Sequence, residues 1–161
     1  MDIKIGQGID IHKLANRESL ILGGIKINSP KGIVGHSDGD IILHALVDSI
    51  LGALSLGDIG DSFPSNEKKW ENVDSVVFLD YAIERMKYFN YRILNTDITI
   101  ILQSPTIRKY KNKIKQNISS LLNIKINQIS IKATTTDRLG FIGEKKGIAC
   151  FATTLLINNG N

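Results

Sequence analysis

The sequence predicts an α+β fold, in which a mixed β-sheet carries helices packed on one face. Three observations support this class. Strand-like segments lie at both ends of the chain, a strongly apolar segment has helical length, and two further strand-like segments flank an amphipathic one. The 161 residues fit a single domain, residues 1–161, and 42% of them are hydrophobic, so the chain can bury a core of its own.

Two strands are expected in the first thirty residues. Apolar and polar residues alternate from Ile3 onward, which predicts a strand near residues 3–11. A second strand is expected near residues 20–27, where Gly23 and Gly24 indicate a bulge or a bend.

Two helices are expected next. Residues 40–54 are apolar on all sides, so this helix is expected to be buried over most of its surface. The second helix is expected at residues 75–89, with Asp74 as its N-cap.

The second half predicts a strand, a helix and two more strands. Residues 98–102 are strongly β-like, and Ser104 and Pro105 are typical of a helix N-cap and first turn. The third helix carries an apolar stripe at helical spacing, formed by Ile107, Tyr110, Ile114, Ile118 and Leu121. The last two strands are expected near residues 128–134 and 148–157.

Composition excludes several functional classes. The single cysteine, Cys150, excludes an intrachain disulfide framework and any multi-cysteine zinc site. No apolar run reaches the roughly 18 residues of a membrane span, and the N-terminus lacks a signal-peptide pattern. The net charge of +4 implies only weak attraction to anions, so no nucleic-acid partner is indicated. We therefore expect a soluble protein of the cytosol or of an organelle.

The sharpest local motif is Asp10-Ile11-His12. Because residues two apart on a strand point to the same face, Asp10 and His12 are expected to project together. A carboxylate beside an imidazole is a good ligand pair for zinc. A surface hydrogen bond between the two side chains explains this motif equally well.

His44 lies in the middle of the apolar helix, where an uncompensated imidazole is costly. Asp40, His44 and Asp48 are spaced four residues apart, so they form one polar stripe. Either His44 is a core histidine satisfied by Asp48, or it is a third metal ligand that this carboxylate orients. Two histidines and one carboxylate form a common catalytic zinc set with an open fourth position, so the second interpretation is favoured.

Two segments are candidates for phosphate binding. Residues 35–40 precede the apolar helix, where Ser37 or Asp38 can cap its N-terminus and His36 can donate to an anionic oxygen. Residues 133–137 close a strand with three hydroxyls and one carboxylate, which can hold a Mg²⁺ ion that bridges phosphate oxygens. An ordinary capped turn and an ordinary threonine-rich strand are the alternatives.

Together these motifs resemble the 2-C-methyl-D-erythritol 2,4-cyclodiphosphate synthase family, which belongs to the non-mevalonate isoprenoid pathway. The resemblance covers essentially the whole chain, in order and with matching spacing. It is carried by Gly8-Ile9-Asp10-Ile11-His12, His36-Ser37-Asp38-Gly39-Asp40 with His44 and Asp48, Gly57-Asp58-Ile59-Gly60, and Ala133-Thr134-Thr135-Thr136 with Leu139-Gly140-Phe141.

The resemblance implies an intramolecular phosphoryl transfer. In that reaction 4-diphosphocytidyl-2-C-methyl-D-erythritol 2-phosphate becomes 2-C-methyl-D-erythritol 2,4-cyclodiphosphate and releases CMP. The resemblance implies a zinc ion held by Asp10, His12 and His44. It also implies a second divalent ion, Mg²⁺ or Mn²⁺, near Asp137.

The resemblance further implies which residues touch the substrate. His36 and Thr135 are expected to steady the transition state. The implied substrate-binding residues are Ser37, Asp58, Ile59, Gly60, Phe63, Ser65, Leu102, Ser104, Pro105, Thr106, Ile107, Arg108, Thr134, Phe141, Glu144 and Lys145. The implied assembly is a homotrimer with sites at the subunit interfaces, and the implied location is a bacterial cytoplasm or a plastid stroma.

Four positions depart from the family pattern. Thr106 stands where many relatives carry Lys, and Glu144 stands where many carry Arg, for which one of the two following lysines can substitute. Asp137 replaces a common Glu, and Ser65 stands where relatives often have Asp. None of the four belongs to the zinc set.

Two other functions fit the same residues less well. A nucleotide-binding trimer without turnover has no need of the intact metal set. A metal-dependent phosphohydrolase needs a general base beside an activated water, and the sequence shows no evident one.

Overall fold

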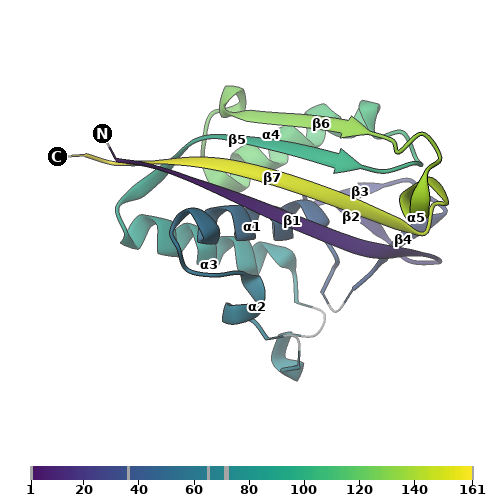
Figure 1. Cartoon of the computed structure of the whole chain (residues 1–161), viewed down its shortest axis with the longest axis horizontal. Coiled ribbons are helices and arrows are strands. Elements are labelled where there is room, and N and C mark those ends of the chain that lie inside the picture. Colours follow the sequence, from purple (N-terminus) through teal and green to yellow (C-terminus); the bar gives the residue numbers. More distant parts are fainter. Residues whose placement is uncertain (1, 36, 65, 71–72, 161) are drawn as a thin grey trace.

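The strands and helices form two layers, which Figure 1 shows with the sheet nearer the viewer than the helices. The computed structural model describes residues 2–35, 37–64, 66–70 and 73–160. The strands are β1 (Ile3–Asn16), β2 (Leu20–Leu22), β3 (Ile25–Ile27), β4 (Lys31–Val34), β5 (Tyr91–Ile101), β6 (Ile129–Thr134) and β7 (Gly147–Asn158). The helices are α1 (Ile41–Ala53), α2 (Ile59–Ser62), α3 (Ser75–Tyr88), α4 (Lys111–Leu122) and α5 (Gly140–Gly143), with short 3-10 helices over Lys68–Trp70, Arg108–Tyr110 and Ile126–Gln128.

Five of the strands form one mixed sheet in the order β4-β1-β7-β5-β6. β1 pairs antiparallel with β4 and β7, and β7 pairs antiparallel with β5, whereas β5 and β6 run parallel. β2 and β3 form a separate antiparallel hairpin. The mixed sheet with its helices confirms the predicted α+β class.

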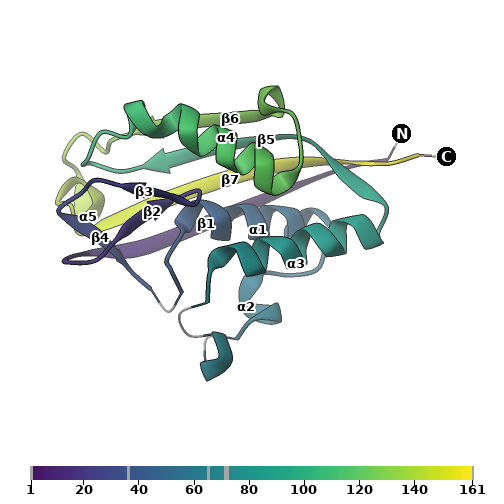
Figure 2. The same ribbon diagram turned by 180° about the vertical axis from the view of Figure 1, so that it is seen from behind.

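The three longest helices, α1, α3 and α4, lie on one face of the sheet, as the view from behind in Figure 2 shows. α1 packs on β1 and β7, α3 packs on α1, and α4 packs on β6. α1 is buried along almost its whole length, and Ile41, Leu46 and Ile50 are fully buried. The core therefore lies between α1 and the centre of the sheet.

Two glycines of β1 permit the close packing of α1. A Cβ atom on Gly6 would stand 2.0 Å from the carbonyl oxygen of Ser49, and one on Gly8 would stand 1.9 Å from that of Ala45. No side chain fits at either distance, so the backbones of strand and helix touch here. This contact carries His44, the neighbour of Ala45, up against β1.

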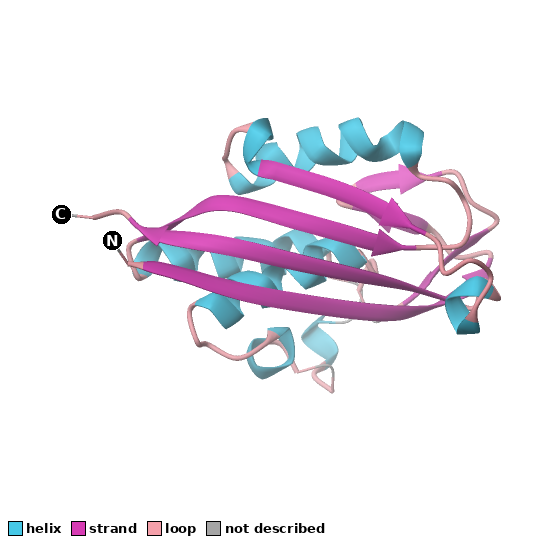
Figure 3. Ribbon diagram, turned by 45° about the horizontal axis from the view of Figure 1, so that its top comes forward, coloured by secondary structure: helices cyan, strands magenta, loops and turns pink. Residues whose placement is uncertain are grey.

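The opposite face of the sheet is left uncovered by α1, α3 and α4 (Figures 1 and 3). Four isoleucines of β1 on this face are 45% to 69% exposed, and the strand register sets four apolar residues of β7 beside them. This open apolar face consists of Ile3, Ile5, Ile9, Ile11, Phe151, Leu155 and Ile157, whereas Ala149 is itself buried. Exposed apolar surface of this extent is typical of a face that meets another protein surface.

The first expected helix, residues 40–54, is confirmed as α1, but its N-cap is Asp40 and neither Ser37 nor Asp38. Asp40 Oδ1 accepts hydrogen bonds from the N–H groups of Ile42 and Leu43 at 3.1 and 3.2 Å. The same carboxylate accepts from Gly23 and Gly24 of the β2–β3 turn. Asp40 is therefore a buried structural anchor.

The expected second strand, residues 20–27, is two strands. Gly23 and Gly24 have φ angles of +57° and +74° and form the hairpin turn between β2 and β3. The prediction of one bent strand was wrong because two adjacent residues with positive φ reverse the chain completely. The short edge strand β4 carries too few residues for a pattern, and the sequence did not indicate it.

The third expected helix begins at Lys111 as α4, and the prediction that it starts at Ser104 and Pro105 was wrong. Those two residues lie in the loop that follows β5, and a 3-10 helix over Arg108–Tyr110 precedes α4. Ile107 is buried, although it lies before both helices. The apolar stripe thus continues out of the helix into the loop, which spacing alone cannot detect.

The remaining expectations for the fold are confirmed. α3 begins after the N-cap Asp74, whose side chain accepts from the N–H of Val76. The strands near residues 3–11, 98–102, 128–134 and 148–157 correspond to β1, β5, β6 and β7, of which β1 and β5 are longer than expected. Cys150 is fully buried, as its apolar neighbours indicate. Among the described helices, none has the length and apolar character needed to cross a membrane.

Candidate metal centre and substrate cavities

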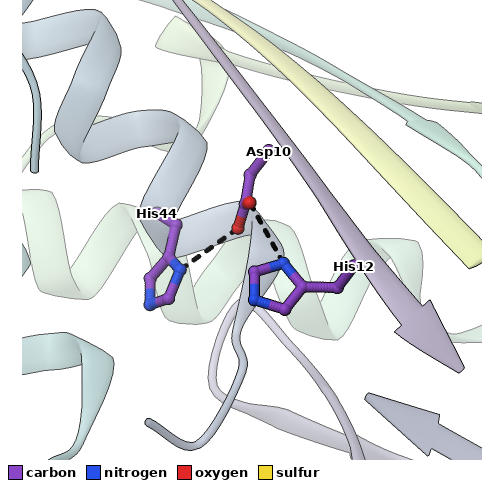
Figure 4. Close-up of side chains that lie close together, drawn as sticks. All are labelled: Asp10, His12 and His44. Carbon is purple, nitrogen blue, oxygen red and sulfur yellow. Dashed lines mark hydrogen bonds and ion pairs between the residues drawn. The ribbon is translucent and has the colours of Figure 1, made fainter. Parts of the chain in front are cut away.

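Asp10, His12 and His44 meet on the helical side of the sheet, as Figure 4 shows. Asp10 and His12 project from the same face of β1, and α1 brings His44 to them. His12 Nδ1 lies 3.0 Å from Asp10 Oδ1, and His44 Nδ1 lies 3.1 Å from Asp10 Oδ2. One ligand atom from each residue falls within 4.8 Å of the other two. The structure thus brings together the three predicted zinc ligands.

The donor set and its geometry fit a zinc ion. Two imidazoles and one carboxylate are ligands that zinc takes in catalytic sites with an open fourth position. His12 Nδ1 is buried and close to Asp10, yet its geometry does not make a hydrogen bond. A buried nitrogen without a hydrogen bond is costly, and a cation shared with the carboxylate would satisfy it.

The two imidazoles favour the ionised form of Asp10, and Asp10 favours the protonated form of His12. Burial raises the pKa of Asp10, but the close contacts with the imidazoles of His12 and His44 outweigh burial and lower that pKa to about 2. The adjacent carboxylate of Asp10 raises the pKa of His12 above 6.5, against the effect of burial. Asp10 is therefore an anion at any physiological pH and is ready to bind a cation.

The outer nitrogen of His44 has two hydroxyl neighbours. Ser75 Oγ lies 2.9 Å from His44 Nε2, and Ser37 Oγ lies 3.2 Å from it. Ser75 in turn donates its hydroxyl hydrogen to Asp38. Ser37 was predicted as a substrate-binding residue, whereas sequence reasoning gave Ser75 no role.

Asp48 does not hold His44, which corrects the expectation that it orients this ring. Asp48 Oδ1 accepts a hydrogen bond of 2.8 Å from the N–H of Ile59, the first residue of α2. The spacing of four residues does place Asp48 on the same stripe of α1. The chain after α1 turns back, however, and the N–H of Ile59 binds the Asp48 carboxylate. Burial raises the pKa of Asp48, and the Ile59 N–H partly offsets this.

A cavity of about 380 Å³ opens beside the metal centre. Its lining includes His12 and His44 together with four residues that the sequence analysis assigned to substrate: Ser37, Ile59, Gly60 and Phe63. Asp58 stands just outside, where it caps α2 and accepts from the N–H of Asp61 at 3.0 Å. We call this the metal-side cavity.

Four lining residues of the metal-side cavity were missed: Asn66, Lys68, Trp70 and Phe78. Phe63 joins Trp70 and Phe78 in an aromatic cluster, with ring centroids 4.8 and 4.7 Å from its own. Phe78 faces the cavity from α3, and helical spacing alone reads it as a core residue. Asn66 lies in a loop, and Lys68 and Trp70 lie in a 3-10 helix of three residues, which is too short for a periodicity to show which side chains turn inward.

A second cavity of about 330 Å³ lies at the other edge of the sheet, between the loop after β5 and the end of β6. It contains seven predicted residues: Leu102, Pro105, Thr106, Ile107, Arg108, Thr134 and Thr135. Gln103, Lys111 and Ala133 also line it, and Ser104 does not. We call this the β6 cavity, and it shares no lining residue with the metal-side cavity.

Thr135 and Asp137 are not brought to the metal centre within one chain. The register runs from Asp10 across β7 and β5 to Ala133, so the two sites lie three strands apart, about 14 Å at the usual strand spacing. Asp137 is exposed and donates its N–H to Thr135 Oγ1 at 3.2 Å. It lies outside the metal-ligand cluster of the described residues.

The remaining predicted residues surround α5. Phe141 is 52% exposed, and Glu144 forms an ion pair of 2.5 Å with Lys146. The carbonyl oxygen of Lys145 accepts from Lys31 Nζ at 2.8 Å. His36 and Ser65, the predicted catalytic and substrate-binding residues, lie outside the described residues.

The chain is similar over nearly its whole length to proteins of one named class. The model of the YgbB family matches residues 3–157. The chain is 47% identical to 2-C-methyl-D-erythritol 2,4-cyclodiphosphate synthase of Leptospira borgpetersenii, over 97% of this chain and 98% of that protein. It is 45% identical to the synthase of the same name from Buchnera aphidicola, over 99% and 95% of the two chains. Among solved structures, IspF of Plasmodium falciparum in complex with CDP is similar with a TM-score of 0.87 and 49% identity, over 98% and 97% of the chains.

Proposed function

Because this chain belongs to the YgbB family and is an enzyme of the 2-C-methyl-D-erythritol 2,4-cyclodiphosphate synthase class, we propose that it catalyses a metal-assisted intramolecular phosphoryl transfer. Its substrate is 4-diphosphocytidyl-2-C-methyl-D-erythritol 2-phosphate. An oxygen of the 2-phosphate bonds to the β-phosphorus, and the bond from that phosphorus to the α–β bridging oxygen breaks. The products are 2-C-methyl-D-erythritol 2,4-cyclodiphosphate and CMP.

The observation that carries this proposal is the cluster of Asp10, His12 and His44 at the wall of a cavity of about 380 Å³. We assign zinc to these three residues. Bound there, zinc supplies a positive charge that neutralises phosphate oxygens. The metal-side cavity takes the methylerythritol part of the substrate, with the aromatic ring of Phe63 against its carbon skeleton.

The protein residues act by holding a single molecule in a reactive shape. Attacking and leaving groups belong to the same substrate, so orientation replaces a protein nucleophile. Cys150 fits this view, since it is fully buried and its burial raises the pKa of its thiol well above the usual value. Thr135 and His36 are assigned to steadying the transition state, and Asp137 to holding Mg²⁺ or Mn²⁺ beside the phosphates.

The β6 cavity takes the cytidyl group, and it does so for a neighbouring subunit. Two observations support a homotrimer with sites at its interfaces. The two cavities of one chain lie on opposite sides of β7 and β5 and share no lining residue, so a second copy can bring the β6 cavity next to the metal centre of the first. The open apolar face needs a cover, and a second and third copy supply it. The CDP bound by the Plasmodium relative is a nucleotide of the kind that this cavity would take.

We place the enzyme in a bacterial cytoplasm or a plastid stroma, with no nucleic acid or membrane as a partner. The curated relatives named above are bacterial, and a single buried cysteine suits a reducing compartment.

The proposal is tested by supplying purified protein with Zn²⁺, Mg²⁺ and the cytidyl-diphosphate substrate, and following the products by phosphorus NMR. We expect CMP together with a cyclic diphosphate, and loss of both after chelation. CMP with a linear phosphate would instead assign the site to hydrolysis. A folded, zinc-loaded trimer that releases no CMP would make the protein a binding trimer without turnover.

A further inference from the structure

The ring of His44 is held from both sides. Its Nδ1 faces Asp10 Oδ2 at 3.1 Å, inside the metal centre, and its Nε2 faces Ser75 Oγ at 2.9 Å, on the side away from it. A neutral imidazole carries one hydrogen, so only one of the two nitrogens can offer a lone pair to a metal ion. If the neighbour of Nε2 accepts a hydrogen bond, the ring hydrogen lies on Nε2 and the lone pair of Nδ1 is left for the metal ion.

The hydroxyl hydrogen of Ser75 is already used. Ser75 donates it to Asp38 Oδ1, and the backbone N–H of Ser75 donates to the other oxygen of the same carboxylate at 3.2 Å. A serine hydroxyl has one hydrogen and two lone pairs, so Ser75 Oγ can only accept from His44. The hydrogen between the two residues must therefore sit on His44 Nε2.

We propose that Asp38 and Ser75 are positioning residues that keep the hydrogen of His44 on Nε2 and leave the lone pair of Nδ1 for the metal ion. The proposal rests on the zinc site of the proposed function. Beside most metal-bound histidines, one carboxylate or carbonyl accepts the hydrogen of the outer ring nitrogen. Here Ser75 accepts that hydrogen, and Asp38 in turn accepts the hydroxyl hydrogen of Ser75. Asp38 does not touch His44 and acts only through Ser75.

The place of these residues in the fold favours this role. Ser75 is the first residue of α3 and is fully buried, and the His44 side chain is 13% exposed, so water is a poor substitute for the hydroxyl. Asp38 lies in the loop before α1, and its backbone N–H donates to the carbonyl of Val73 at 3.4 Å. The chain from Asp38 through Ser75 to His44 thus joins the starts of two helices to the metal centre.

Two other groups near His44 do not provide the same acceptor. Asp48 is engaged by the N–H of Ile59 at 2.8 Å. Ser37 Oγ lies farther from His44 Nε2, at 3.2 Å, than Ser75 Oγ does, at 2.9 Å. Ser75 is therefore the closest acceptor of the Nε2 hydrogen among the described residues.

The test is the zinc affinity of Ser75→Ala, measured by competition with a chromophoric chelator. Loss of an outer partner of a metal-bound histidine costs about 10- to 100-fold in affinity, so we expect a loss in that range. Ser49→Ala is the matched control, because Ser49 is also fully buried but bonds Thr154 and the carbonyl of Leu46. We expect Ser49→Ala to bind zinc as tightly as the unaltered chain.

A spectroscopic measurement separates positioning from simple loss of structure. In the zinc-loaded protein labelled with ¹⁵N-histidine, we expect His44 to show a hydrogen on Nε2 and none on Nδ1. In Ser75→Ala we expect this Nε2 hydrogen to exchange faster with water, while circular dichroism stays that of the folded chain. A hydrogen found on Nδ1 of His44 in the zinc form would overturn the proposal whether or not Ser75→Ala folds.

These readouts do not depend on turnover. If the unaltered protein binds zinc through His44 Nδ1 but forms no cyclic product, the proposed reaction fails and the role of Ser75 stands. Equal zinc affinity in Ser75→Ala and the unaltered chain overturns the role of Ser75 and leaves the reaction untouched. If the unaltered chain binds no zinc at all, both fail.

Discussion

Gly8 of β1 lies against the carbonyl oxygen of Ala45 of α1, so closely that a Cβ atom on Gly8 would stand 1.9 Å from it. This backbone contact sets the height of α1 above the sheet. Since His44 precedes Ala45, the same contact sets the distance from His44 to Asp10, which is 3.1 Å. The metal centre thus depends on the absence of a side chain two residues before Asp10.

Gly8→Ala is therefore expected to disturb both stability and the metal centre. The added methyl group must push α1 away, at a cost of about 1–3 kcal/mol or more for an overpacked core, and zinc affinity should fall with it. Thermal unfolding and zinc competition measure the two effects. Gly52→Ala is the matched control on α1, because its Cβ would meet nothing nearer than 3.9 Å and alanine favours a helix by about 1 kcal/mol. An unchanged melting temperature in Gly8→Ala would refute this role.

Much of the metal centre could be predicted from the sequence, because its three ligands follow from the periodicity of a strand and that of a helix. The strand period of two placed Asp10 and His12 on one face, and the helical period singled out His44 on an apolar helix. Neither period shows which helix face meets which strand. The glycines of β1 indicate that another backbone approaches the strand closely, but the sequence does not show which helix makes that approach.

The partners of the metal ligands were predicted less well. Helical spacing suggested that Asp48 lies beside His44. In the structure α2 folds back, and the N–H of Ile59 donates to Asp48 Oδ1 at 2.8 Å. Ser75 reaches His44 from a helix 31 residues further along the chain, a contact that depends on how α3 packs on α1. Local sequence patterns do not show how helices pack on one another. The 3-10 helix that contributes Lys68 and Trp70 to the metal-side cavity is too short to give a pattern.

His44→Ala is expected to abolish zinc binding and turnover while the chain remains folded. The substitution removes a ligand but leaves the apolar residues of α1, such as Leu43 and Leu46, in place. Metal analysis of the purified variant, with gel filtration as a check on folding, measures the outcome. Zinc retained at full stoichiometry would contradict the assignment of His44 as a ligand.

The metal-free protein should show a stability optimum in mildly acidic solution. The pKa of Asp10 falls from 3.8 to about 2 on folding, so its contribution of about 2 kcal/mol is lost as the pH falls from about 4 toward 2. The pKa of His12 rises above 6.5 on folding, so its contribution is present below pH 6.5 and is lost as the pH rises through the folded value. The two contributions to the free energy of unfolding arise from the same pair, Asp10 and His12, so they are not summed.

Melting temperatures of chelator-treated protein against pH check this prediction. Asp10→Asn should remove the loss of stability below about pH 4 and the part of the loss above pH 6.5 that comes from His12, because it removes the charge that shifts both groups. Zinc should reverse the trend above pH 6, since the metal binds neutral imidazoles and its affinity rises with pH. A zinc-loaded protein with the pH profile of the chelated one would contradict the assigned ligand set.

Ile5→Glu is expected to convert the proposed trimer into monomers. Ile5 is 69% exposed and lies within the open apolar face, where a buried charge without a partner would be costly. Sedimentation velocity measures the assembly. Val77→Glu on α3 is the control, because Val77 is also exposed, at 45%, but lies on the helical side. Trimers that persist in Ile5→Glu would require a different interface.

Lys111→Ala is expected to weaken substrate binding about tenfold or more. Lys111 is half-buried at the wall of the β6 cavity and forms no ion pair with the described residues. The nearby Thr106 and Thr134 carry no charge, so Lys111 and Arg108 are the cations that this cavity can present to a phosphate. A hydrogen bond to a charged group contributes about 1.5–3 kcal/mol, which corresponds to a factor of ten or more in affinity.

The expected signature of Lys111→Ala is a rise in KM for the cytidyl-diphosphate substrate with a smaller change in kcat, since the lysine holds a phosphate that stays with the leaving CMP. Lys113→Ala is the matched control, because Lys113 is exposed on α4 and does not line the cavity. Titration with CDP gives the same comparison without turnover. Equal CDP affinity in the two variants would show that Lys111 does not contact the phosphates, and would leave Arg108 as the cation of this cavity.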